Sequence, residues 1–268
     1  MPSAIPLSPT ERATLPAPPL PDAGCALFLD VDGCLLAFKD DPQAVVVPVA
    51  LQTLLQQLHA ALGGALALVS GRSVDDLERL FGAPAWTLAG LHGFQLRYAD
   101  GHHREVTVDP AEERHMRREV TALAARLEHV QLEDKQQAMA LHCRRAPWQL
   151  SVLREAAEAL IPQLPGYELQ PGNLVMEFKP AGMNKGLVVA ELLRVAPFAG
   201  RRPVYLGDDL TDEYGFAVAN REHGLSVRVG SREPTAARFT LADPAAVQDW
   251  LARALAALAP SFPQGGSA

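Results

Sequence analysis

The chain has 268 residues, of which 48% are hydrophobic and 21% charged, and its formal net charge is −7. This composition is typical of a globular protein with one large or two modest domains, and the negative charge argues against nucleic-acid and anionic-membrane partners. The chain contains no apolar run of 18 residues, its N-terminus lacks a secretory signal, and its three cysteines lack metal-ligand spacing, so we expect a cytoplasmic protein.

The first informative stretch follows a proline-rich segment. Residues 1–24 contain seven prolines, and we expect them to form a flexible lead-in. The apolar run 26–29 predicts a buried strand, and it ends in Asp30 and Asp32, followed by Gly33. Because residues i and i+2 of a strand share a side, both carboxylates point the same way. They repel by roughly 1–4 kcal/mol at surface-like dielectric, so either this is a plain polar turn or a cation, a shared proton or a reaction justifies the pair.

A second strand and its helix follow. Leucines between residues 51 and 62 form a helical stripe, and the run 65–69 predicts a strand that ends in Ser70, Gly71 and Arg72. Ser73 and Asp76 form a capping box for a helix near 74–81. Ser70 and Gly71 therefore follow the second strand in the same way as the aspartate pair follows the first strand.

The middle of the chain has a different rhythm. Helices are predicted from residue 110 to about 127 and from 147 to 160, with a strand near 137–144 between them. Two further strands, 167–170 and 173–179, are joined by the turn signal Pro171–Gly172. We expect a small antiparallel sheet covered by two helices, an inserted α+β domain over residues 104–180.

The last part returns to alternating strands and helices. A helix opens at Asn184 and Lys185, and the apolar strand 203–207 leads into an acidic cluster containing Asp208, Asp209 and Asp212. A strand at 225–229 and a helix at 244–259 complete the pattern. It predicts a doubly wound, mostly parallel α/β sheet built from residues 25–103 and 181–258, with a flexible tail at 259–268.

These motifs, in this order and on these elements, resemble the haloacid-dehalogenase-like (HAD) phosphatase superfamily. Five further stretches resemble trehalose-6-phosphate phosphatases, namely 89–93, 132–135, 140–147, 176–186 and 207–213. The resemblance covers about residues 25–255. It implies a HAD-like core with a cap over the active site, and hydrolysis of trehalose 6-phosphate to trehalose and phosphate.

The resemblance also implies a role for each motif residue. Asp30 is expected to attack phosphorus and form an aspartyl-phosphate, and Asp32 to act as general acid and base. Ser70 and Lys185 are expected to hold the phosphoryl oxygens. Crowded carboxylates and a phosphate together favour Mg²⁺ as cofactor. Its expected ligands are Asp30, Asp208 and the carbonyl of Asp32, while Asp209 and Asp212 either ligate directly, act through water or orient Lys185.

A disaccharide phosphate offers many hydroxyl groups, so its site should be polar. Glu177 lies on the strand face opposite Met176 and Phe178, where its carboxylate can accept two hydroxyl hydrogen bonds. Glu133 and Lys135, at a strand entrance, can do the same. The full set of expected substrate contacts is Gly33, Gly71, Arg72, His92, Glu133, Lys135, Arg144, Glu177, Lys179 and Asn184.

One residue departs from the superfamily pattern. Cys34 stands where threonine is usual, and because a thiol is a weak donor we expect tuning rather than loss of activity. Three alternatives remain open at this point: a phosphatase of another sugar phosphate such as sucrose 6-phosphate, a phosphosugar mutase, and a non-enzymatic receiver-type regulatory domain. The sequence leaves the oligomeric state undecided, and a monomer is compatible with it.

Overall fold

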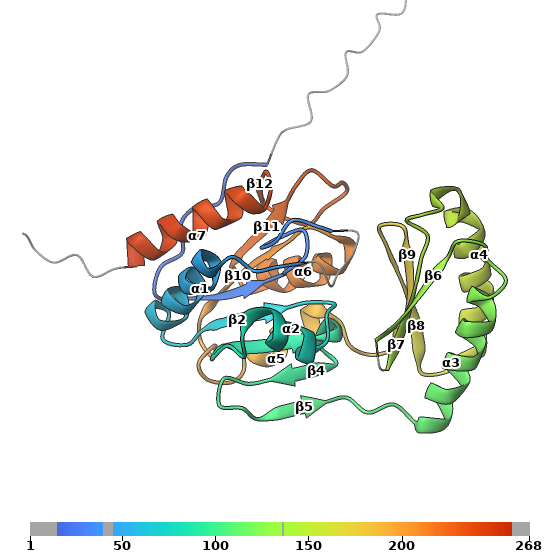
Figure 1. Ribbon diagram of the computed structural model, residues 1–268. Helices are drawn as coiled ribbons and strands as arrows, with labels where there is room; N and C mark the ends of the chain where they lie inside the picture. The colour runs from blue at the N-terminus through green and yellow to red at the C-terminus, as the bar shows by residue number, and fades with distance from the viewer. Residues whose placement is uncertain (1–14, 40–44, 136, 259–268) are drawn as a thin grey trace, which may run out of the picture.

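The computed structural model describes residues 15–39, 45–135 and 137–258, which contain two sheets (Figure 1). The eight-stranded sheet has the order β12-β11-β10-β1-β2-β3-β4-β5, parallel from β12 to β3 and antiparallel at β4 and β5. Its strands are β1 (Cys25–Leu29), β2 (Leu66–Val69), β3 (Thr87–Gly90), β4 (Gln95–Arg97), β5 (His103–Glu105), β10 (Arg202–Gly207), β11 (Leu225–Val229) and β12 (Phe239–Leu241). The mostly parallel α/β prediction is confirmed.

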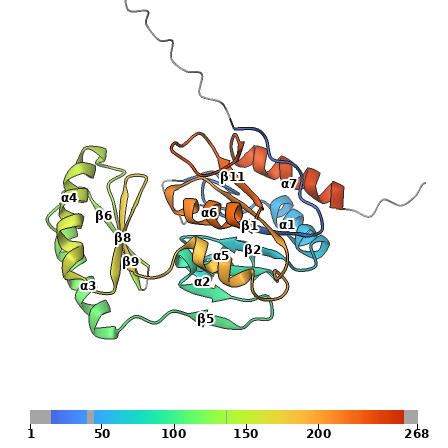
Figure 2. The ribbon, with the colours of Figure 1, turned by 180° about the vertical axis from the view of Figure 1, so that it is seen from behind.

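Helices cover both faces of this sheet, which explains why its central strands are continuous apolar runs. Helices α1 and α7 contact each other on one face, and α5 and α6 contact each other on the other (Figures 1 and 2). The bounds are α1 (Val49–Ala61), α2 (Val74–Phe81), α5 (Lys185–Leu192), α6 (Glu213–Arg221) and α7 (Pro244–Leu258). Ser73 caps α2 as predicted, because its side chain accepts a hydrogen bond from the amide of Asp76.

The second sheet has four antiparallel strands in the order β6-β7-β9-β8. Two helices cover its far side, and its other face is turned toward the large sheet (Figure 1). The bounds are β6 (Gln131–Lys135), β7 (Ala138–His142), β8 (Tyr167–Gly172), β9 (Val175–Pro180), α3 (Pro110–Ala124) and α4 (Leu150–Leu160). Met139, Leu141, Met176 and Phe178 pack against the helices in a core of their own. Alternation along the strands therefore turns the intervening polar residues toward the large sheet.

Two details of the small sheet differ from the sequence prediction. Glu133 and Lys135 lie within a strand, β6, rather than at a strand entrance. Pro171 and Gly172 are the last residues of β8, and the turn is formed by Asn173 and Leu174. Pro171 is tolerated there because β8 is an edge strand, where a missing N–H removes no obligatory ladder bond.

The boundary expected at residue 104 falls inside β5, which pairs with β4 and extends the large sheet to Glu105.

The described part of the lead-in, residues 15–24, also differs from expectation, because it is held against the core. The carbonyl of Pro16 accepts a hydrogen bond from the Thr240 amide, and that of Pro18 from the Trp250 indole. Residues 1–14 and the predicted tail 259–268 lie outside the described residues. Every helix within the described ranges is too short or too polar to cross a lipid bilayer.

Candidate active site

The candidate site lies where three parallel strands end side by side. Asp30 follows β1, Ser70 follows β2, and Asp208 follows β10, and β1 is hydrogen-bonded to both of the other strands. The direction of chain progression reverses at β1, and open α/β sheets bind ligands at such a switch point. A cavity of about 670 Å³ opens here and is also lined by residues of the four-stranded sheet. The fold therefore places the predicted motifs on one cavity.

A buried lysine joins two of the carboxylates. Lys185, the first residue of α5, is 2% exposed, and its Nζ donates to Asp30 Oδ1 at 2.8 Å and to Asp212 Oδ1 at 2.7 Å. Burial opposes its charge, but Asp212 and Asp30 hold the pKa of Lys185 well above the usual value. Asn184 caps α5 by accepting a hydrogen bond from the Leu187 amide, which fixes the turn that carries this lysine.

Asp212 has used its hydrogen-bonding capacity within the protein. Its Oδ1 accepts from Lys185 and from the Tyr205 hydroxyl at 2.8 Å, and its Oδ2 accepts from the amides of Asp208 and Asp209, each at 3.0 Å. A carboxylate offers about four lone-pair positions, so these four donors occupy it. Of the three roles left open by the sequence, this geometry favours orientation of Lys185.

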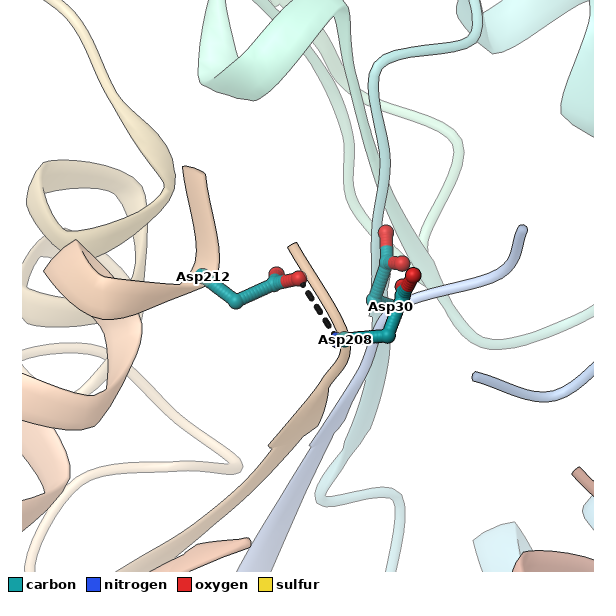
Figure 3. Close-up of side chains that lie close together, drawn as sticks. All are labelled: Asp30, Asp208 and Asp212. Carbon is teal, nitrogen blue, oxygen red and sulfur yellow. Dashed lines mark hydrogen bonds between the residues drawn. The ribbon is translucent and has the colours of Figure 1, made fainter. Parts of the chain in front are cut away.

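Asp30 and Asp208 are the carboxylates best placed for a cation (Figure 3). Oxygen atoms of Asp30, Asp208 and Asp212 lie within 4.8 Å of one another. Asp208 Oδ1 is buried and has no hydrogen-bond partner among the described residues. Since a buried, unpaired carboxylate oxygen is costly, the donor set fits a hard cation such as Mg²⁺.

The acid–base equilibria of this cluster agree with that fit. Burial, reinforced by Asp212 and Asp209, raises the pKa of Asp208 to about 7. Burial also raises the pKa of Asp212 to about 6. For Asp30, burial raises the pKa well above the usual value although Lys185 acts in the opposite direction. The single positive charge of Lys185 does not balance the ionised carboxylates of Asp30, Asp208 and Asp212. A divalent cation would supply the missing positive charge.

Gly33 makes room for Asp208. It has a φ of +85°, and a Cβ at this position would lie 2.2 Å from Asp208 Oδ2. Glycine is therefore required both by the backbone conformation and by the close approach of the carboxylate. Its predicted role as a direct substrate contact has no counterpart in the cavity lining.

The second aspartate of the first motif pairs with an arginine. Arg72 binds the Asp32 carboxylate through two contacts of 2.6 Å, from Nε to Oδ2 and from Nη2 to Oδ1. The Arg72 amide also donates to Ser70 Oγ at 3.2 Å. All three residues line the cavity, so the fork of Arg72 fixes the direction of Asp32 relative to Ser70.

His92 enters the cavity on a strained turn. Leu91 and His92 have φ values of +48° and +57°, a conformation that side chains rarely adopt. Their amides donate to the carbonyls of Arg72 and Ser70, which holds the turn on the second motif. A Cβ on Gly71 would lie 2.9 Å from the His92 ring, so the absence of a side chain there admits the imidazole.

The small sheet presents a charged trio to the same cavity. Glu177 Oε2 lies 3.3 Å from Lys135 Nζ and 3.5 Å from His92 Nε2. Burial opposes ionisation of Glu177, but Lys135 and His92 outweigh it and hold its pKa well below the usual value. Glu177 Oε1 and His92 Nδ1 are buried without hydrogen-bond partners in the described part of the chain. Hydroxyl groups of a bound ligand would supply the hydrogen-bond partners that these two buried atoms lack.

Beside this trio, Glu133 accepts a 2.7 Å contact from His142 Nε2 on the neighbouring strand β7, and both residues line the cavity. Arg144 also lines it, with its guanidinium 4.5 Å from the ring centroid of Phe38. The prediction had not included His142 or Phe38. Strand alternation places His142 on the polar face, but its contact with Glu133 depends on register between strands.

Besides Gly33, two further predicted substrate contacts lie outside the cavity lining. Lys179 is buried, and its Nζ binds Glu168 at 2.7 Å and the Met183 carbonyl at 2.9 Å. Asn184 serves as the helix cap described above. Neither residue lines the cavity, so each supports the chain leading to Lys185. Cys34 is buried, and burial raises the pKa of its thiol well above the usual value, which leaves it in the unreactive thiol form.

Comparison with known proteins gives consistent matches. A model of the family described as trehalose-phosphatase matches residues 28–245. A probable trehalose-phosphate phosphatase of Sinorhizobium fredii is 43% identical over 210 residues, covering 78% of this chain and 79% of that protein. Trehalose-6-phosphate phosphatase of Escherichia coli K12 is 42% identical over 226 residues, covering 84% and 85%.

The fold has a solved counterpart as well. The C-terminal domain of Candida albicans trehalose-6-phosphate phosphatase aligns with a TM-score of 0.78, covering 87% of this chain and 93% of that one. Sequence identity in this alignment is 22%, so the likeness concerns the fold.

Proposed function

Because the chain belongs to the trehalose-phosphatase family, we propose that it hydrolyses trehalose 6-phosphate to trehalose and inorganic phosphate, the last step of a trehalose synthesis. One observation supports this most directly. Glu177 Oε1 is buried without a described partner, on a cavity whose opposite wall carries Asp30 and Lys185. Glu177 Oε1 can accept a hydrogen bond from a sugar hydroxyl, while Asp30 and Lys185 are suited to react with and bind a phosphoryl group.

In the first step, a carboxylate oxygen of Asp30 forms a bond to phosphorus while the bond from phosphorus to the sugar oxygen breaks. Lys185 and Ser70 bind the phosphoryl oxygens and stabilise their charge. Asp32 gives its proton to the departing sugar oxygen. Arg72 contacts both Asp32 oxygens, so one of these two contacts has to open before that oxygen carries the proton, while the other keeps Asp32 in place.

In the second step, water attacks the phosphorus of the aspartyl-phosphate, Asp32 accepts a proton from that water, and Asp30 is released. The proton taken here replaces the one that Asp32 gave to the sugar, so the cycle balances. Asp30, Asp208 and the Asp32 carbonyl would hold Mg²⁺, which when bound neutralises carboxylate and phosphoryl charge. Asp212 keeps Lys185 in place, and Asp209 caps the following turn through Thr211.

We assign sugar recognition to the polar face of the small sheet, with the segment after β5, residues 106–180, acting as a cap. Lys135 and His92 hold one oxygen of Glu177, which leaves Oε1 to accept from a hydroxyl group. Glu133 and Lys135 lie on the same face and offer an acceptor and a donor.

The substrate proposal is tested by phosphate release from trehalose 6-phosphate, sucrose 6-phosphate and glucose 6-phosphate in the presence of Mg²⁺. We expect kcat/KM for trehalose 6-phosphate to exceed the other two values at least a hundredfold, because only that disaccharide matches the full set of contacts. A preference for sucrose 6-phosphate would instead support the nearest alternative.

Glu177→Ala should separate sugar recognition from chemistry. The loss of a hydrogen bond to a charged acceptor costs roughly 1.5–3 kcal/mol, so kcat/KM for trehalose 6-phosphate should fall on the order of tenfold to a hundredfold. Hydrolysis of p-nitrophenyl phosphate, which has no sugar, should change little. Glu158→Ala, at an exposed position on helix α4 of the same inserted domain, is the matched control and should leave both rates nearly unchanged. Equal losses on both esters would assign Glu177 to the catalytic centre.

A further inference from the structure

An arginine outside the motifs around Asp30, Ser70, Lys185 and Asp208 binds the acidic loop after β10 at several points. Arg232 lies in the segment between β11 and β12, 23 residues beyond Asp209 in sequence. Its Nε donates to the Asp208 carbonyl at 3.2 Å, and its Nη2 donates to the Asp209 carbonyl at 3.1 Å. Nη2 also pairs with Glu213, and Nη1 donates to the Pro234 carbonyl at 3.1 Å. One guanidinium therefore joins two loops.

The contact with Asp208 completes the restraint of a single peptide group. The unit between Asp208 and Asp209 carries the Asp208 carbonyl at one end and the Asp209 amide at the other, and it is planar. Arg232 holds the carbonyl, while Asp212 Oδ2 holds the amide at 3.0 Å. Because both ends of the plane are fixed, rotation about the bonds next to the Asp208 Cα is restricted. The direction of the Asp208 Cα–Cβ bond is thereby set, which limits the positions that its carboxylate can reach.

The loop that carries Arg232 is itself anchored. Arg228 on β11 donates from Nη1 to the Arg232 carbonyl at 2.7 Å and to Glu233 Oε1 at 2.5 Å. Glu213 accepts from the Ala236 amide at 2.7 Å through its second oxygen. The Arg232 side chain is therefore held by contacts with β11 and α6, and it fixes the acidic loop after β10 relative to these two elements.

We propose that Arg232 is a positioning residue for the cation site, which acts by fixing the carboxylate of Asp208 toward Asp30. The inference rests on the proposed metal-dependent function. The planar fork of arginine supplies donors in the geometry that two successive carbonyls require, whereas the single ammonium of lysine does not. Arg232 touches neither the phosphate site nor the sugar site, so its effect should appear in cation affinity.

The test is isothermal titration calorimetry of substrate-free protein with MgCl₂, for the wild type, Arg232→Ala and Arg232→Lys. Loss of partners that orient a metal ligand typically costs tenfold to a hundredfold in affinity, so we expect Kd for Mg²⁺ to rise about tenfold or more in both variants. Arg238→Ala is the matched control, because Arg238 is exposed on the same segment and has the same charge. Its Kd should equal that of the wild type.

Thermal melts in EDTA separate this role from a purely structural one. A lower Tm with an unchanged Kd, in either variant, would overturn the proposal, and so would unchanged values of both. If Arg232→Ala does not fold, Arg232→Lys decides the question alone, since it keeps the charge and the aliphatic chain. Wild-type protein that binds no Mg²⁺ would contradict the proposed function itself, whereas equal Kd values in wild type and variants would contradict only the role of Arg232.

Discussion

Asp30→Asn should lower phosphate release from trehalose 6-phosphate by on the order of 10⁴-fold or more, because an amide is a poor nucleophile. The amide oxygen can still accept from Lys185, which now donates to Asp30 at 2.8 Å. The substitution also removes one buried negative charge from a site that contains Asp208 and Asp212. We therefore expect the variant to fold with a Tm at least equal to that of the wild type.

Phosphate release in steady state and circular-dichroism melts check this result together. Asp249→Asn is the matched control, because Asp249 is exposed on α7 and lies away from the cavity. Turnover within tenfold of the wild type by a folded Asp30→Asn protein would rule out the aspartyl-phosphate mechanism.

Removal of divalent ions should abolish activity, and Mg²⁺ should restore it. Without a cation, the buried carboxylates repel one another, as the raised pKa of about 7 at Asp208 indicates, with burial as the larger cause. They then also compete with the substrate phosphate for the single charge of Lys185. We expect activity to fall at least a hundredfold after chelation, on both trehalose 6-phosphate and p-nitrophenyl phosphate.

The measurement uses protein treated with EDTA and then passed over a chelating resin, with metal content determined by mass spectrometry. EDTA already saturated with Mg²⁺ is the control for effects of the chelator itself. Addition of Mg²⁺ at 100 times its Kd should stabilise the folded state by about 2.7 kcal/mol, which appears as a higher Tm. Full activity at a metal content far below the enzyme concentration would refute the assigned cation site.

The sequence was most informative where function depends on the order of local motifs. The strands before Asp30, Ser70 and Asp208 are apolar runs with both faces buried, and such runs can be recognised without long-range information. The predicted trehalose-phosphatase resemblance is confirmed by the family match, which also leaves the mutase and receiver-type alternatives without support. Strand β12 was not predicted, because three residues at a sheet edge give too short a pattern.

The remaining differences arise from contacts between distant residues. The saturation of Asp212 involves Tyr205, whose position in an apolar strand suggested only a core residue. The clamp by Arg232 depends on how the segment after β11 lies over the loop after β10. Lys179 was expected to contact substrate, but the Met183 carbonyl and Glu168 bind its ammonium group instead. The hydrophobic periodicity of a strand predicts which face a side chain lies on, but it does not predict which distant residue that side chain contacts.

The contact between Gly33 and Asp208 also limits how this site can evolve. The position of a Cβ on residue 33 overlaps the Asp208 carboxylate, although 175 residues separate the two in sequence. A side chain at 33 would therefore displace the Asp208 carboxylate, and the φ of +85° would strain any residue other than glycine there. A single substitution at position 33 should therefore reduce activity by disturbing Asp208. Libraries that randomise both positions together should return glycine and aspartate.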